Sequence, residues 1–231
     1  MKLTRKSIAL AVAGFSTLAM GGCGHSRMRP APTANVPRSA PWSAYVEDAG
    51  IRVSASTETW DGRPEDLPEV MTPVKVRLKN ESGRPIRILY DDFALQPEGG
   101  PSFHPVPPVP LETAPGMGLA GLRPIYASSG FHVAQAYKAI VPSYDAWPEP
   151  LPRDASSAAK EYAGWSSGLP TREMRRRALF EGVLEDQGVT SGYLYFSRRA
   201  RAGDTVVFRA DLADAQDGET VASVDIPFVV E

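Results

Sequence analysis

Apolar and polar residues alternate with a period of two in several short stretches of this 231-residue chain. Successive side chains of a β-strand point to opposite faces, so each such stretch predicts a strand that buries one face. We expect about seven strands separated by Gly-, Pro- and Asn-containing turns. The stretches are residues 51–55, 74–79, 86–90, 93–95, 189–196, 205–212 and 220–230.

Strands with one apolar face are buried most simply when two antiparallel sheets pack face to face. The 22 prolines also point away from a helical protein, because proline is confined to strand edges, turns and extended segments. We therefore expect an all-β fold, an immunoglobulin-like antiparallel sandwich with a long irregular or helical insertion at residues 113–185. It would lack the disulfide of antibody domains, since Cys23 is the only cysteine.

Local signals refine this expectation. The turn residues at 80–85 predict a hairpin between the strands on either side. Thr171 is a typical helix N-cap, and the apolar spacing that follows predicts a helix ending near Gly182. A short helix is also expected at residues 155–162. Residues 105–110, Pro-Val-Pro-Pro-Val-Pro, predict either a segment at the sheet edge or an exposed docking peptide.

The N-terminus has the layout of a bacterial export signal. Three cations among the first six residues precede an apolar run from Ile8 to Met20 and two small residues before Cys23. This pattern resembles the lipobox of bacterial lipoproteins, with Met20 where that family usually has leucine. The resemblance implies removal of residues 1–22 and acylation of Cys23.

The lipobox resemblance also implies attachment to the cell envelope. Gly24 after the cysteine is similar to the pattern that sorts lipoproteins to the outer membrane of Gram-negative bacteria, facing the periplasm. Residues 23–44 are polar, rich in proline and alanine, and without apolar periodicity, so we expect a flexible tether. A single domain would then span residues 45–231.

Several stretches of the C-terminal third resemble a family of bacterial lipoproteins that has no assigned activity. The resemblance therefore implies a fold and a location, and it implies no catalytic residues. The stretches are residues 169–174, 178–184, 188–196, 210–212 and 226–228.

Composition and motifs argue against several kinds of function. The formal net charge is −2, which does not favour a nucleic-acid partner. No serine lies in a G-x-S-x-G elbow, and His25, His104 and His132 follow no metal-ligand spacing. Asp91 and Asp92 are neighbours, which in a strand would point to opposite faces, so a turn is favoured over an acid/base pair. We expect no catalytic site, no metal and no cofactor.

The acidic residues near the C-terminus could form either a calcium site or an acidic rim on a hairpin. They lack the twelve-residue loop pattern of such a site, so an acidic hairpin rim is favoured. They are Asp211, Asp214, Asp217 and Glu219.

Aromatic and arginine residues are the remaining candidates for partner binding. Aromatic rings bury large areas at low entropic cost, either against a partner or against the sheet itself. The candidate rings are Tyr126, Phe131, Tyr137, Tyr144, Trp147 and Trp165. The arginines at 172, 175, 176 and 177 could contact anionic lipid headgroups or envelope glycans, or form a solvated face.

These expectations favour a cell-envelope lipoprotein that acts as a non-enzymatic binding or assembly module. Its partners would be the membrane, through the lipid anchor, and an envelope protein or glycan. The alternatives are an envelope hydrolase or hydrolase accessory, and a passive structural lipoprotein.

Overall fold

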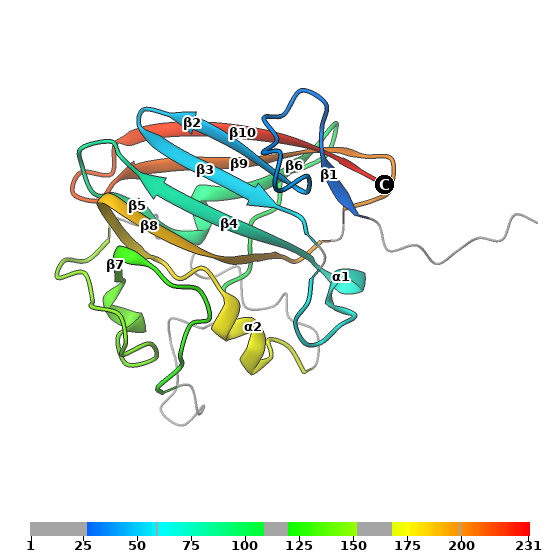
Figure 1. Cartoon of the computed structure of the whole chain (residues 1–231). Helices are drawn as coiled ribbons and strands as arrows, with labels where there is room; N and C mark the ends of the chain where they lie inside the picture. Colours follow the sequence, from blue (N-terminus) through cyan, green and yellow to red (C-terminus); the bar gives the residue numbers. More distant parts are fainter. Residues whose placement is uncertain (1–26, 59, 109–119, 152–167, 199) are drawn as a thin grey trace, which may run out of the picture.

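The computed structural model describes residues 27–58, 60–108, 120–151, 168–198 and 200–231. These residues form a β structure in which the paired strands are antiparallel (Figure 1). The prediction of an all-β fold is therefore confirmed. Within these ranges, no helix combines the length and the apolar character needed to cross a membrane.

The described residues contain ten strands and four short helical segments. The strands are β1 (Met28–Pro30), β2 (Ser43–Asp48), β3 (Ile51–Ser56), β4 (Thr72–Asn80), β5 (Ile86–Ile88), β6 (Phe93–Pro97), β7 (Ser129–Val133), β8 (Gly182–Phe196), β9 (Thr205–Asp214) and β10 (Thr220–Val230). The helices are α1 (Leu67–Val70) and α2 (Arg172–Arg177), with 3₁₀ turns η1 (Tyr90–Asp92) and η2 (Gln135–Tyr137).

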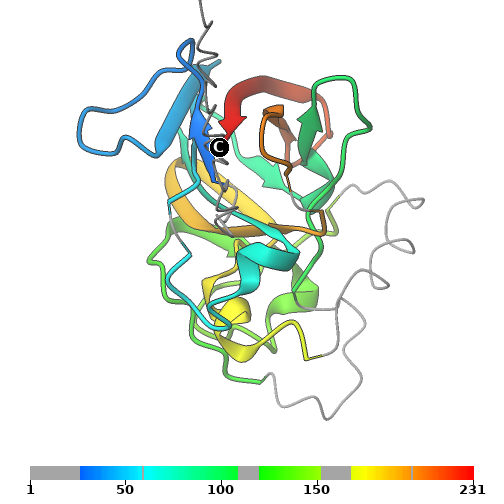
Figure 2. The ribbon, with the colours of Figure 1, turned by 90° about the vertical axis from the view of Figure 1, so that its right-hand side faces the viewer.

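All ten strands belong to one sheet that curls back on itself, with the order β1-β10-β9-β5-β8-β4-β3-β2. Strand β6 pairs with β9, and β7 pairs with β8. Strand β5 joins the two halves, because Ile86 lies opposite Leu184 of β8 and Asp214 of β9. At the other end β2 approaches β10, where the Ser223 amide donates to Asp48 Oδ2 at 3.3 Å. The result is nearly a barrel, as the end view in Figure 2 shows.

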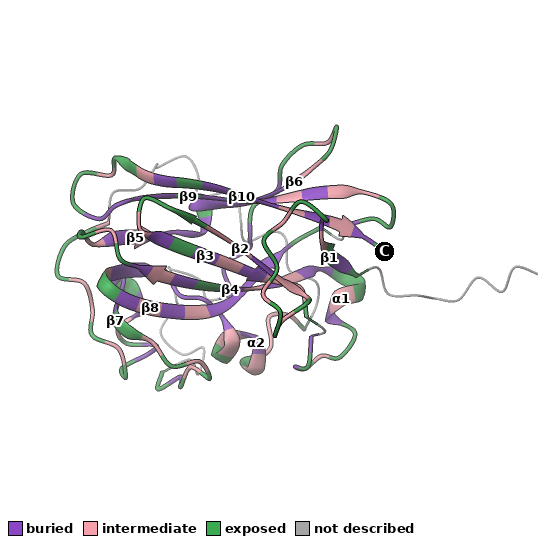
Figure 3. Ribbon diagram, turned by 45° about the horizontal axis from the view of Figure 1, so that its top comes forward, coloured by how far each residue is buried: buried purple, intermediate pink, exposed green. Residues whose placement is uncertain are grey.

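The apolar faces that alternation predicts do point inward. Val74, Val76 and Leu78 of β4 are fully buried, whereas Arg77 between them is exposed. The same alternation of buried and less buried residues runs along β10, where Ile226 and Phe228 are fully buried (Figure 3). One continuous core therefore fills the space inside the curled sheet.

Strand β8 differs from the others because both of its faces are buried. Leu194 and Phe196 lie in the main core, and Tyr193 and Tyr195 lie in a second apolar cluster on the opposite face. A strand buried on both sides reads as a continuous apolar run rather than as an alternation. This second cluster holds α1 and α2 against the outside of the sheet.

The predicted hairpin around residues 80–85 is wrong. Strands β4 and β5 both pair antiparallel with β8, at residues 189–196 and 182–184 respectively, so they run in the same direction. The turn between them is stabilised by Asn80, whose Nδ2 donates to Arg84 O and to Leu184 O at 2.8 and 3.0 Å. The turn moves the chain along β8 to a position where β5 also pairs with β9, and it does not reverse the direction of the chain.

The predicted helix at 171–182 begins as expected but ends at Arg177. Thr171 is its N-cap, with Oγ1 accepting a hydrogen bond from the Met174 amide at 3.2 Å. After Arg177 the chain becomes extended, and the Leu179 amide donates to Tyr193 O at 3.0 Å. Pairing with β8 therefore replaces the last predicted helical turn. The helix expected at 155–162 lies outside the described residues.

Two predicted boundaries differ from the structure. Residues 27–44, within the predicted tether, include β1, which pairs with the end of β10, and Met28 is buried. The predicted insertion at 113–185 contributes β7 and the first residues of β8 to the sheet. Residues 105–108 lie along the end of β8, where the Val106 amide donates to Tyr195 O at 2.7 Å.

Gly192 allows the chain after α2 to lie against β8. A Cβ atom at this position would meet the backbone of Ala178 and Leu179, which is itself fixed by the pairing with Tyr193. We expect Gly192→Ala to lower the free energy of unfolding by about 2–4 kcal/mol, because packed backbone cannot move aside. Urea denaturation measures the change, and Ser191→Ala on the neighbouring residue is the control. Equal stability of the two variants would contradict this role.

Candidate functional site

The structure describes five of the six rings predicted to contact a partner. Tyr137 is fully buried and Phe131 is 6% exposed, so neither presents its ring to solvent. Tyr126, Tyr144 and Trp147 are half-buried. Trp165, like Cys23, lies outside the described residues.

The described rings connect the segment 120–151 to the sheet. Phe131 packs edge-to-face on Tyr144 with centroids 5.5 Å apart, and Tyr137 packs on Phe180 at 5.7 Å. The Tyr144 hydroxyl donates to Tyr126 O at 3.2 Å. These contacts show that much of the aromatic surface of this segment is used in packing within the domain.

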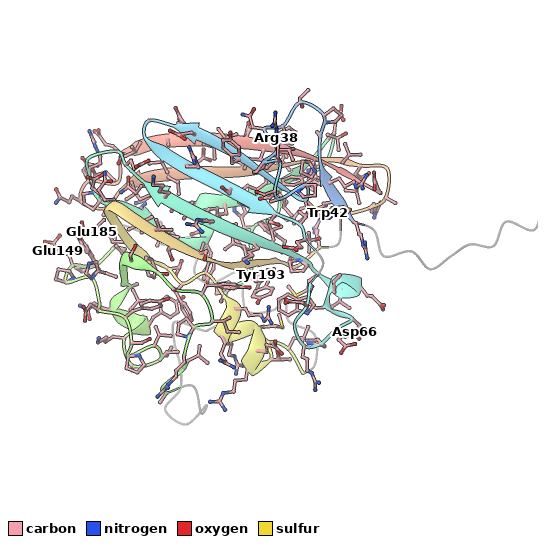
Figure 4. The ribbon with its side chains drawn as sticks, viewed as in Figure 1. Arg38, Trp42, Asp66, Glu149, Glu185 and Tyr193 are labelled. Atoms are coloured by element: carbon pink, nitrogen blue, oxygen red, sulfur yellow. The ribbon has the colours of Figure 1, made fainter. Side chains whose placement is uncertain are left out.

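A second group of rings lies on the outer face of β8. It consists of Trp60, Tyr126, Tyr193 and Tyr195, and we call it the ring cluster. Tyr193 lies between the sheet and α2 (Figure 4). Lys75 Nζ lies 4.4 Å from the Tyr126 ring centroid. Burial raises the pKa of Tyr193 and of Tyr195, so both remain neutral phenols at physiological pH.

Helix α2 covers the ring cluster with one face and exposes arginines on the other. Met174 is fully buried against the cluster. Arg177 lies over Trp60 and forms ion pairs with Asp61 at 2.6 Å and with Glu173 at 3.0 Å. Burial lowers the pKa of Arg175, whose Nε donates to Pro108 O at 3.3 Å.

Three arginines from two segments line one surface hollow of about 630 Å³, which we call the arginine hollow. Arg172 and Arg176 come from α2, and Arg123 comes from the segment that precedes β7. Two hydrogen bonds join the segments: Arg176 Nε donates to Arg123 O at 3.1 Å, and the Ile125 amide donates to Arg176 O at 2.9 Å. Gly121 and Glu173 complete the lining.

Charge in the arginine hollow is not balanced locally. Among the described residues, neither Arg123 nor Arg172 has an acidic group within ion-pair distance. Glu173 is already engaged, with Oε1 paired to Arg177 and Oε2 accepting from the Arg63 amide at 3.1 Å. The hollow therefore presents an excess of positive charge to solvent.

A pair of buried carboxylates lies at the junction of β5, η1 and β8. Glu181 is 5% exposed, and it accepts from the Tyr90 amide at 3.0 Å and from the Tyr137 hydroxyl at 3.1 Å. Asp92 is 8% exposed, and its Oδ2 accepts from the Leu89 amide at 2.9 Å. Glu181 thereby joins η1 to η2, which supports the segment that carries the rings.

Burial raises the pKa of Asp92 to about 7. The Leu89 amide and Arg87, whose Nη2 lies 3.9 Å from Oδ1, oppose this shift, whereas Glu181 and Asp91 add to it. The expected turn at Asp91 and Asp92 is present as η1. The two carboxylates do not share a site, because Asp91 is exposed.

The two described histidines that could act as metal ligands, His104 and His132, each contact a different neighbouring group. His104 Nδ1 is 2.8 Å from Phe93 O, and His132 Nε2 is 3.7 Å from Glu185 Oε1. Near the C-terminus, Asp211 accepts from Ser223 Oγ, and Asp214 from the Gln216 amide. Within the described ranges, no group of three or more histidine, cysteine or acidic residues could hold a metal ion.

Together these features define an all-β domain with a cationic surface hollow and buried carboxylates in structural hydrogen bonds. No protein-family model, no curated protein and no solved structure matches this chain.

Sequence reasoning missed Arg123 and Glu181. Glu181 does have a local signal, because it interrupts the apolar run of residues 178–184, and a charged residue there indicates a buried partner. Arg123 has no such signal. Its place beside α2 follows from pairing across about 50 residues of sequence.

The bond between Tyr137 and Glu181 is buried, so its loss should be costly. We expect Tyr137→Phe to lower the free energy of unfolding by about 1–3 kcal/mol, because a buried carboxylate oxygen loses a donor. The matched control is Tyr144→Phe, whose half-buried hydroxyl should contribute less than about 1 kcal/mol. Urea denaturation at neutral pH compares the two. A larger loss for Tyr144→Phe would contradict the role of Glu181.

The raised pKa of Asp92 makes stability depend on pH. Between about pH 4 and 7 the folded protein binds more protons than the unfolded chain, so the free energy of unfolding falls as the pH rises. Asp92→Asn keeps an oxygen for the Leu89 amide and should flatten this slope, by at most about 4 kcal/mol across the range. Denaturation curves at several pH values measure it, with Asp91→Asn as the exposed control. An unchanged slope would show that Asp92 does not titrate there.

Proposed function

We propose that this chain is a lipid-anchored protein of the bacterial cell envelope that binds a partner without catalysing a reaction. The N-terminal pattern that ends at Cys23 supports the anchor, since it resembles a lipobox. Several acyl chains hold such proteins firmly, because each buried CH₂ adds about 0.8 kcal/mol. The domain then acts at the membrane surface. Gly24 resembles the sorting signal for the outer membrane, so we place the domain there, facing the periplasm.

The scaffold in this proposal is an immunoglobulin-like sandwich whose layers are joined along one edge. One layer contains β2, β3, β4 and β8, and the other contains β6, β9 and β10. Strand β5 pairs with both layers, which accounts for the single continuous sheet. Loops and short helices carried on a rigid β scaffold are a common way to build a recognition surface.

The arginine hollow is the observation that carries the proposal. Three exposed arginines from distant parts of the chain line one hollow, where two hydrogen bonds join their segments, and two of them have no acidic partner among the described residues. Arginine is enriched at recognition surfaces because its planar guanidinium binds carboxylate and phosphate groups in two-point contacts. The partner is therefore an envelope component that carries anionic groups.

An envelope hydrolase is the second candidate, favoured by the raised pKa of Asp92 alone. The contacts of this carboxylate support a structural role instead. It is bonded to the amide of its own turn, and burial is the main cause of its shifted pKa. Glu181 is likewise engaged by Tyr90 and Tyr137. A binding module therefore accounts for more of the geometry.

Site-specific photocrosslinking in the producing bacterium tests the proposal. A photoreactive residue at Ile125, which is 41% exposed beside the hollow, should give a crosslinked species. The control position is Val36, which is 42% exposed in the loop before β2. Adding Arg123→Gln and Arg172→Gln should remove the Ile125 species, because the anionic partner loses its contacts. Crosslinking that is equal at both positions, or indifferent to the arginines, would contradict the proposed surface. Palmitate labelling that persists in Cys23→Ser would contradict the anchor.

A further inference from the structure

The arginine hollow has the dimensions of a small-molecule site. Its volume of about 630 Å³ falls within the roughly 300–1,000 Å³ typical of such pockets. Gly121 lies at its edge with a φ of +75°, and a Cβ built there would meet no atom within 4 Å. The hollow is therefore open at this edge, and a ligand can approach the backbone there.

One of the three cations in the hollow, Arg176, is held in place before any ligand arrives. Arg176 is fixed at both ends, since its Nε donates to Arg123 O and its own carbonyl accepts from the Ile125 amide. Arg172 follows Thr171, the N-cap of α2, whose hydroxyl also donates to Arg63 O at 2.8 Å. Fixing one donor and the backbone that carries another lowers part of the entropic cost of binding.

The chemistry of the lining selects the ligand. Three guanidinium groups around one hollow approach a ligand from several directions, which suits the tetrahedral oxygens of a phosphate group better than the two oxygens of a planar carboxylate. Glu173, the one acid in the lining, is already paired with Arg177, so its repulsion of an incoming anion is partly offset. The arrangement favours a compact, tetrahedral oxyanion.

We propose that Arg123, Arg172 and Arg176 form a binding site for a phosphate group. This inference deepens the proposed function, on which it rests for its biological setting, by naming the anion that the partner carries. Free phosphate and the phosphodiester of an anionic phospholipid headgroup share this chemistry. The guanidinium groups donate to the terminal oxygens, and Gly121 leaves room for the remainder of the ligand.

Calorimetric titration of the purified full chain in a nonionic detergent tests the site directly. The two probes are inorganic phosphate and glycerophosphoglycerol, which is the soluble headgroup of phosphatidylglycerol. Replacing both Arg123 and Arg172 with glutamine should weaken binding at least about tenfold, because two charged hydrogen-bond donors are lost. Neither side chain makes a hydrogen bond within the described residues, so the fold should be retained, and far-UV circular dichroism checks this.

The matched control removes two exposed arginines elsewhere. Arg38→Gln with Arg77→Gln causes the same change in net charge, and Arg38 lies on the opposite side of the domain from α2 (Figure 4). The control should bind phosphate within about twofold of the unmodified chain, since general charge attraction is weak and screened by salt. Tighter binding of phosphate supports a free phosphate ligand, and tighter binding of the diester supports a lipid headgroup.

Three results would overturn the inference: neither probe binds, the double variant binds as well as the unmodified chain, or the control loses affinity equally. The photocrosslink at Ile125 separates this outcome from failure of the proposed function. Crosslinking without phosphate binding would leave a binding module that recognises another anion. Loss of both the crosslink and phosphate binding would contradict the proposed binding surface itself.

Discussion

The close approach of the chain after α2 to Gly192 is the contact on which the arginine hollow depends. Because no Cβ lies between them, the backbone of Ala178 and Leu179 rests directly on β8 and pairs with Tyr193. That pairing ends α2 at Arg177 and sets the orientation of the helix over the ring cluster. The positions of the arginines in α2 follow from a backbone contact that tolerates no side chain.

Burial of both faces of β8 explains why the surface is cationic rather than aromatic. The strand needs cover on its outer face, and Trp60, Tyr126 and Met174 supply it together with its own tyrosines. Rings that are packed against the face of a sheet are not available to contact a partner. The segments that carry these apolar residues must be polar on their other side, and in α2 that side consists mainly of arginine.

Seven of the ten described strands could be predicted from the sequence, because period-two alternation is a local property that burial of one face requires, whereas β1, β2 and β7 were not predicted. The cap at Thr171 was predictable for the same reason, since its hydrogen bond spans three residues. The direction of the chain after Asn80 was not, because a turn with the same residues can reverse the chain or shift it along a third strand. Arg123 and Arg176 meet only through tertiary packing. The sequence around either residue therefore contains no signal that predicts the arginine hollow.

Three guanidinium groups around one hollow raise the free energy of the unliganded protein, although solvent and salt screen much of the repulsion. The packing of α2 does not require Arg123 and Arg172, because Met174 fills the buried position of the helix and, of the three arginines, only the Arg176 side chain bonds to the neighbouring segment. Features that oppose stability without a structural role are expected at functional sites, where the loss is recovered on binding. The buried carboxylates differ in this respect. Glu181 joins η1 to η2, so its burial serves the fold, whereas the side chains of Arg123 and Arg172 make no hydrogen bond within the described residues.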